Sequence, residues 1–153
     1  MVRRDADGIW ATLRETISAH AEEVFACLTT VDGLTRWFPV AAEIDLRPGG
    51  GLVLGWDAKF FRRLTVRIAD YDAGGRVTWT WPVGIEGDEV RVSWTVEPDV
   101  EAGAKVLMRS GPYHETTEAL MALADDLESW RWYLCNLRTV LESRIDMRSV
   151  RPL

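Results

Sequence analysis

The sequence predicts an α+β fold in which a curved antiparallel sheet packs across one long helix near the C-terminal end. Residues 41–110 consist of short runs of alternating apolar and polar side chains separated by tight turns, which is typical of an antiparallel meander. Residues from about 117 to 147 instead have the pattern of a helix with a single apolar stripe. Neither the stripe nor the apolar face of the sheet can be buried alone, and laying one across the other buries both.

The first strand is expected over residues 9–18, where apolar and polar side chains alternate. One of its faces carries Ile9, Ala11, Leu13, Glu15 and Ile17. Glu15 is therefore a charged residue on an otherwise apolar face. A helix over residues 19–30 follows, with Ser18 as its N-cap. A second short helix ends against Pro39, because proline disfavours helical conformation in the residue before it.

Six more strands complete the predicted sheet. They are expected over residues 41–46, 52–56, 61–71, 76–81, 89–98 and 104–110. In the last of them, simple alternation leaves open which face points inward. One face carries Ala104, Val106 and Met108, and the other carries Lys105, Leu107 and Arg109. The first set is the more apolar of the two.

The last helix should bury its apolar stripe and expose the opposite side. The stripe consists of Leu123, Leu127, Trp130, Leu134, Leu137 and Leu141. Tyr133 lies at its edge, whereas Trp132 falls on the opposite side with Glu128, Asn136 and Thr139. An outward tryptophan lowers solubility unless something covers it. We therefore expect a homodimer contact at Trp132, or shielding by a terminal segment.

Composition excludes several classes of protein. The 153 residues fit one domain over 1–153, and the net charge of −6 argues against a partner with a phosphate backbone, so no nucleic acid is expected. No run approaches the ~20 apolar residues of a membrane span, so no membrane partner is expected either. The N-terminal residues carry no secretory signal pattern, and only two cysteines occur. A cytoplasmic protein with reduced thiols is the expectation.

Motifs for catalysis or metal binding are weak. Residues 114–118, HETTE, match half of the zinc-protease pattern His-Glu-x-x-His, but Glu118 stands where the second histidine belongs. Cys27 and Cys135 would be nucleophiles only if His20 or His114 lay beside one of them, and a helical cysteine is more often a small buried hydrophobe. We therefore expect no catalytic residue, no metal and no cofactor.

Three motifs, in order, resemble the START-like or SRPBCC superfamily, and within it the family named for the heat-shock-protein-90 ATPase activator. They are ISAHAEEVFACLTTVDGLTRWFP (17–39), AEIDLRPGG (42–50) and ESWRWYLCNLRTVLE (128–142). The resemblance covers about residues 9–148. It implies a helix-grip fold, with a cavity between the sheet and the C-terminal helix that binds a small hydrophobic molecule. Some relatives are cyclases or hydrolases.

The resemblance also assigns candidate cavity residues. Six tryptophans on expected inward faces would form aromatic walls or ordinary core: Trp37, Trp56, Trp79, Trp81, Trp94 and Trp130. Tyr133 and Leu134 of the last helix join them. The family match points Lys105, Leu107 and Arg109 inward, which would bring Glu15 near Lys105. Arg109 would then meet an anionic ligand group; the alternative is a salt bridge at the sheet rim, worth ~1 kcal/mol or less.

These expectations favour a binding protein for a small hydrophobic molecule. The first alternative is a cyclase- or hydrolase-like enzyme that uses Glu15 or Arg109, and it needs at least two converging polar groups in the pocket. The second alternative is a co-chaperone-like regulator of a heat-shock ATPase, which would act through its surface.

Overall fold

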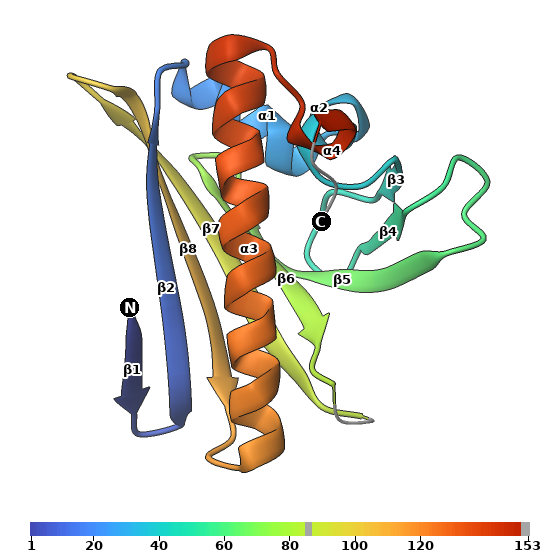
Figure 1. Cartoon of the computed structure of the whole chain (residues 1–153), viewed down its shortest axis with the longest axis vertical. Coiled ribbons are helices and arrows are strands. Elements are labelled where there is room, and N and C mark those ends of the chain that lie inside the picture. Colours follow the sequence, from blue (N-terminus) through green and yellow to red (C-terminus); the bar gives the residue numbers. More distant parts are fainter. Residues whose placement is uncertain (85–86, 151–153) are drawn as a thin grey trace.

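The computed structural model of the chain, which describes residues 1–84 and 87–150, contains one eight-stranded antiparallel sheet with a long helix laid across it (Figure 1). The strands are β1 Val2–Asp5, β2 Gly8–Ile17, β3 Ala41–Ile44, β4 Gly51–Gly55, β5 Arg63–Asp72, β6 Arg76–Pro82, β7 Glu89–Asp99 and β8 Gly103–Tyr113. The helices are α1 Ala21–Thr29, α2 Val31–Trp37, α3 Thr117–Ser143 and α4 Met147–Val150. The predicted helix-grip fold is confirmed.

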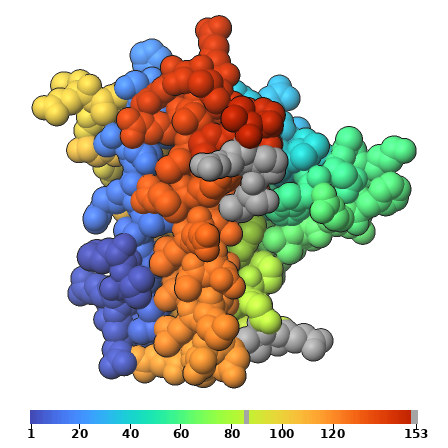
Figure 2. All heavy atoms as spheres, in the orientation of Figure 1, coloured from blue at the N-terminus to red at the C-terminus, as the bar shows by residue number. Residues whose placement is uncertain are grey.

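The sheet order is β1-β2-β8-β7-β6-β5-β4-β3, so the first long strand pairs with the last one. Helix α3 runs along the sheet, and α1 and α2 close one end of the space between them (Figure 1). On the surface, the hairpin of β4 and β5 protrudes to one side of α3, opposite the side of β1 and β2 (Figure 2). Among the described residues, no helix has the length and apolar character needed to cross a membrane.

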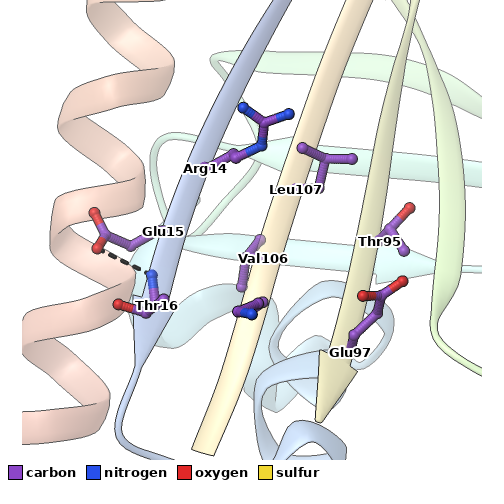
Figure 3. A pocket seen from close by; sticks show the side chains of 8 residues that line it. Arg14, Glu15, Thr16, Thr95, Glu97, Val106 and Leu107 are labelled. Carbon is purple, nitrogen blue, oxygen red and sulfur yellow. Dashed lines mark hydrogen bonds between the residues drawn. The ribbon is translucent and has the colours of Figure 1, made fainter. Parts of the chain in front are cut away.

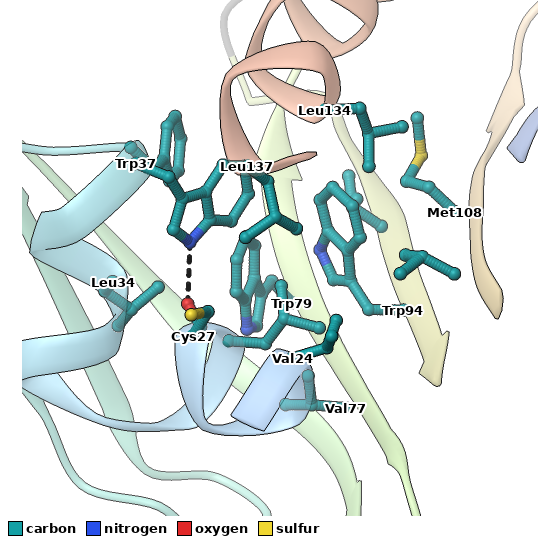
Figure 4. Packing of buried hydrophobic residues seen from close by; sticks show 14 of the residues in the cluster. Val24, Cys27, Leu34, Trp37, Val77, Trp79, Trp94, Met108, Leu134 and Leu137 are labelled. Atoms are coloured by element: carbon teal, nitrogen blue, oxygen red, sulfur yellow. Dashed lines mark hydrogen bonds between the residues drawn. The ribbon is translucent and has the colours of Figure 1, made fainter. Parts of the chain in front are cut away.

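A continuous hydrophobic core with several aromatic rings fills the space between sheet and helix (Figure 4). Trp37, Trp79 and Trp94 are fully buried, and Trp130 of α3 is only 3% exposed. The Trp94 ring meets Trp37 at a centroid distance of 5.9 Å and Trp130 at 5.3 Å. Burial of such large rings stabilises the contact of α3 with the sheet.

The observed elements differ from the predicted ones by an additional strand and by changed ends, two of which concern helices. Strand β1 was not predicted, because its sequence VRRD has no apolar alternation; it forms by pairing with the edge of β2. Helix α3 ends at Ser143 instead of about residue 147, since Arg144 adopts a left-handed conformation with φ of 56°. Helix α1 begins at Ala21 with His20 as its N-cap, not Ser18.

The face of β8 that the family match pointed inward is the outer one, so that expectation is wrong. Ala104, Val106 and Met108 are buried against the core, whereas Lys105 and Arg109 are exposed and Leu107 is half-buried on the outside. The more apolar face of β8 points inward because burying the charges of Lys105 and Arg109 without partners would be costly.

The expected outward placement of Asn136 is also wrong. Asn136 is fully buried, because α2 and the chain after α3 cover that side of the long helix. Its neighbour on the predicted outer side, Trp132, is half-buried and meets the Tyr133 ring edge-on at 5.0 Å. The predicted homodimer contact at Trp132 stays a prediction.

Candidate ligand-binding site

One pocket opens beside α3, where the helix faces the ends of β4 and β6 and the α2–β3 connection. We call it the aromatic pocket, and its volume is about 250 Å³. Its lining consists of Phe38, Trp56, Trp81, Asp126, Ser129, Trp130 and Tyr133. Four of these residues, Trp56, Trp81, Trp130 and Tyr133, are among the candidates named from the sequence.

Local structure brings the lining together. Asp126, Ser129, Trp130 and Tyr133 are spaced three, one and three residues apart, which places them on one face of α3. Trp81 lies two residues after the buried Trp79 on β6 and so points to the same side of the sheet. The remaining rings come from connections: Trp56 follows β4 directly and Phe38 follows α2 directly.

Phe38 forms the floor of the aromatic pocket and contacts every ring in its wall. Its ring centroid lies 4.8 Å from that of Tyr133, 5.2 Å from Trp130, 6.0 Å from Trp56 and 6.1 Å from Trp81. Phe38 is only 3% exposed, whereas Trp56, Trp81 and Tyr133 are half-buried. The pocket therefore has a fixed apolar floor and a wall whose rims reach solvent.

The backbone under Phe38 is held by two side chains from the end of the chain. Asn136 Nδ2 donates to the carbonyl oxygen of Trp37 at 2.8 Å. Arg148 Nη1 donates to the carbonyl of Phe38 at 3.3 Å and to that of Pro39 at 2.8 Å. Three consecutive carbonyls are thus satisfied by α3 and α4, which fixes the position of the floor ring.

Asp126 is the one charged side chain in the lining of the aromatic pocket. The Tyr113 hydroxyl donates to Asp126 Oδ2 at 2.8 Å and lies 2.8 Å from the Ser110 hydroxyl. Burial raises the pKa of the Asp126 carboxyl, and the neighbouring Asp125 adds to the rise, while the bond from Tyr113 opposes it. The carboxyl is therefore held in a fixed position against an apolar wall.

The other aromatic candidates belong to the closed core. Trp37, Trp79 and Trp94 have no exposed surface, and neither has Leu134. The Trp37 indole nitrogen donates to the carbonyl oxygen of Cys27 at 2.7 Å (Figure 4). These side chains fill the space where a larger cavity was expected, and none of them lines the aromatic pocket.

Glu15 faces α3 as the alternation predicts, but its expected closeness to Lys105 is wrong. Glu15 accepts from Arg131 at 3.3 Å and from Arg138 at 3.1 Å, both on α3. Lys105 points to the other side of the sheet and pairs with Asp99 at 2.8 Å. Neighbouring strands put register partners on the same face, and the partner of Lys105 in β2 is Thr16, one residue on from Glu15.

Arg109 lies on the outer face, away from any cavity between sheet and helix. Its guanidinium pairs with Asp5 of β1 at 2.9 Å and lies 4.0 Å above the Trp10 ring. These contacts tie the edge strand β1 to the sheet. They correspond to the rim salt bridge that was the alternative to a ligand contact.

Replacing Arg109 with methionine should leave ligand affinity unchanged and lower the free energy of unfolding by about 1 kcal/mol or less, because its ion pair is exposed. Binding titration and denaturant melts of the variant measure both quantities. A clear loss of ligand affinity with an unchanged free energy of unfolding would show that Arg109 contacts the ligand and would contradict this prediction.

A larger groove, of about 410 Å³, lies over the outer face of β2, β8 and β7 (Figure 3). It is lined by Arg14, Glu15, Thr16, Thr95, Glu97, Lys105, Val106 and Leu107. In the close view, Leu107 stands among polar side chains, and the Glu15 carboxylate turns toward α3 and accepts from the Thr16 amide (Figure 3). Leu107 therefore lines this open groove and not the aromatic pocket.

The cysteine and metal hypotheses find no support in the described part of the chain. Burial raises the pKa of the Cys27 thiol, which disfavours the nucleophilic thiolate. No group of three or more His, Cys, Asp or Glu side chains in the described ranges is arranged to hold a metal ion.

Three residues of the aromatic pocket were missed in the sequence: Phe38, Asp126 and Ser129. Helical spacing could have found two of them, because Asp126 lies four residues before Trp130, and Ser129 lies three residues after Asp126 and four before Tyr133. Phe38 had no comparable signal, because its place depends on contacts from distant parts of the chain.

Comparison of the sequence with models of known protein families identifies the family of this chain. Residues 18–142 match the model of the family described as "Activator of Hsp90 ATPase homolog 1-like protein". The chain belongs to this family. A comparison with curated proteins finds no match.

Solved structures agree on the fold. A Staphylococcus saprophyticus protein is 17% identical, with a TM-score of 0.75 over 91% of this chain and 96% of its own. The Aha1 dimer from Colwellia psychrerythraea is 22% identical, with a TM-score of 0.68 over 88% and 96%. CalU16 from Micromonospora echinospora is 20% identical, with a TM-score of 0.69 over 99% and 86%. At these identities the likeness concerns the fold alone.

Proposed function

We propose that this member of the activator-homolog family binds a small hydrophobic molecule in the aromatic pocket. The observation that carries the proposal is the lining, in which five aromatic side chains surround an open volume and Asp126 and Ser129 are the polar residues besides Tyr133. Ligand sites are mostly apolar with a few placed polar groups, and this lining has that composition.

Size limits the ligand. Pockets for drug-sized molecules measure roughly 300–1,000 Å³, and about 250 Å³ is available here. One or two rings, or the end group of a longer molecule, fit this volume. Trp56 and Trp81 are half-buried at the pocket rim, so the rest of a longer ligand would extend past them into solvent.

The lining favours binding over catalysis. Within the described residues, it contains one carboxylate and no histidine, lysine or arginine. A cyclase or hydrolase needs an acid and a base, or a nucleophile and a base, that converge on the ligand. Asp126 has no such partner in the lining, so the proposed role is to hold a molecule.

Titration with neutral aromatic compounds, from toluene to naphthalene, tests the proposal. Trp56, Trp81 and Trp130 line the pocket, so binding should change tryptophan emission in a saturable way. Trp81→Leu should weaken binding about tenfold, as expected for the loss of a central aromatic contact.

Trp10→Leu is the matched control, because Trp10 lies on the outer face beside Arg109. Its affinity should equal that of the wild type. The absence of a saturable change across the whole series, or equal losses in the two variants, would contradict binding in the aromatic pocket.

A further inference from the structure

The rings that line the aromatic pocket lie at varied angles, and the planes of Phe38 and Trp81 cross at only 35°. The Phe38 and Trp56 planes cross at 90°, and those of Phe38 and Tyr133 cross at 75°. Trp81 and Trp130 meet at 58° with their centroids 4.9 Å apart. These rings are in contact with one another, and together they line the open volume of the pocket, which we call the cup. Since the face of an aromatic ring is the negative part of its quadrupole, such a cup attracts positive charge.

Asp126 adds a carboxyl group to the same cup. No salt bridge joins it to any lysine, arginine or histidine in the described part of the chain; the hydroxyl of Tyr113 is its hydrogen-bond partner there. That bond occupies Oδ2, and within the same ranges Oδ1 accepts no hydrogen bond. A half-buried carboxylate without a cation is costly, and a bound cation would remove that cost.

We infer that the aromatic pocket selects a small organic cation, with a quaternary or methylated ammonium group held among the rings and facing Asp126. This inference rests on the proposed function, since it names the class of ligand for the same pocket. Other proteins bind quaternary ammonium groups in cages of aromatic side chains. Such a group is positively charged but has no N–H donor that would lose its hydrogen bond to water on binding.

The surroundings favour the same sign of charge. Asp125 lies beside Asp126 in sequence, and the whole chain carries a net charge of −6. A neutral molecule of equal shape would fill the cup but leave the carboxylate unpaired. Selectivity for the cation therefore comes from a difference in affinity between two ligands of the same size.

Choline and 3,3-dimethylbutan-1-ol test this directly, because the alcohol has the shape of choline without its charge. Tryptophan emission or ligand-observed NMR of the full chain gives both affinities. Choline should bind about tenfold or more tightly than the alcohol, as the cation–π and ionic contacts together imply.

Two variants locate the charge that is responsible. Asp126→Asn keeps an oxygen that can accept from Tyr113, and it should lower choline affinity about tenfold while leaving the alcohol within about twofold. Glu128→Gln is the matched control, since it removes one exposed carboxylate from the same helix and should change neither affinity by more than about twofold. Thermal melts verify that both variants are folded.

Equal affinities for choline and the alcohol would overturn the inference while leaving the proposed function intact. So would a choline affinity that falls equally in the two carboxylate variants, because a general field would then be the cause. Failure of choline to bind, with naphthalene still binding, also rejects the cation and retains the pocket. If neither choline nor any neutral aromatic compound binds, both proposals fail.

Discussion

Replacing Trp130 with alanine should lower the free energy of unfolding by about 3–5 kcal/mol, the usual cost of deleting a large core aromatic side chain. Trp130 is 3% exposed and lies between α3 and the sheet, with Trp94 at 5.3 Å and Trp81 at 4.9 Å. Its loss would leave a cavity at the contact that holds the long helix to the sheet. Urea melts at neutral pH measure the change.

Trp132→Ala is the control, because Trp132 lies two residues away on the same helix and is only half-buried. Trp132→Ala should lower the free energy of unfolding by about 1–2 kcal/mol, because folding buries less of the Trp132 side chain than of Trp130. A loss below about 1 kcal/mol for Trp130→Ala would be typical of a surface position and would contradict the packing of α3.

Replacing Asn136 with leucine should lower the free energy of unfolding by about 2–4 kcal/mol, although leucine has a similar volume. Asn136 is fully buried; its Oδ1 accepts from the Met147 amide at 2.7 Å, and its Nδ2 donates to Trp37. Leucine would leave a backbone carbonyl and a backbone amide without partners. Denaturant melts give the cost, and titration with an aromatic probe should show weaker binding because the pocket floor loosens.

Thr139→Val is the matched control on the same helix. The Thr139 hydroxyl donates to the Asn136 carbonyl at 3.1 Å, as a local bond within one helix. Its loss should cost about 0.5 kcal/mol. Equal losses for Thr139→Val and Asn136→Leu would mean that the bonds from α3 to the α2–β3 connection contribute nothing to stability.

Periodicity was enough to predict the order of the elements from β2 to α3. The alternation of β6 and β8 and the stripe of α3 each depend on residues a few positions apart, and such patterns survive without knowledge of the fold. Alternation alone left the buried face of β8 open, although the more apolar set, Ala104, Val106 and Met108, is the one that the structure buries. The family match pointed Arg109 the other way, and the cost of burying its charge decided against that direction.

The binding site was predicted only in part, because its position depends on contacts between distant residues. Asn136 reaches Trp37 across 99 positions, and Arg148 reaches Phe38 across 110. No pattern among neighbouring residues in the sequence indicates that Asn136 and Arg148 hold the backbone of the pocket floor. The number of tryptophans was visible in the sequence, but which of them fill the core and which remain at an open rim depends on how closely α3 approaches the sheet.

The bonds from Arg148 make the pocket and the C-terminal end of the chain two parts of one linked equilibrium. A ligand that packs on Phe38 favours the ordered α2–β3 connection, and this favours the docked position of α4. Linkage is reciprocal: detachment of α4 lowers the affinity for the ligand by the same factor by which the bound ligand favours the docked position of α4. A fluorescent dye attached at Val150 would convert this coupling into an optical signal, and the protein into a biosensor for whatever its pocket holds.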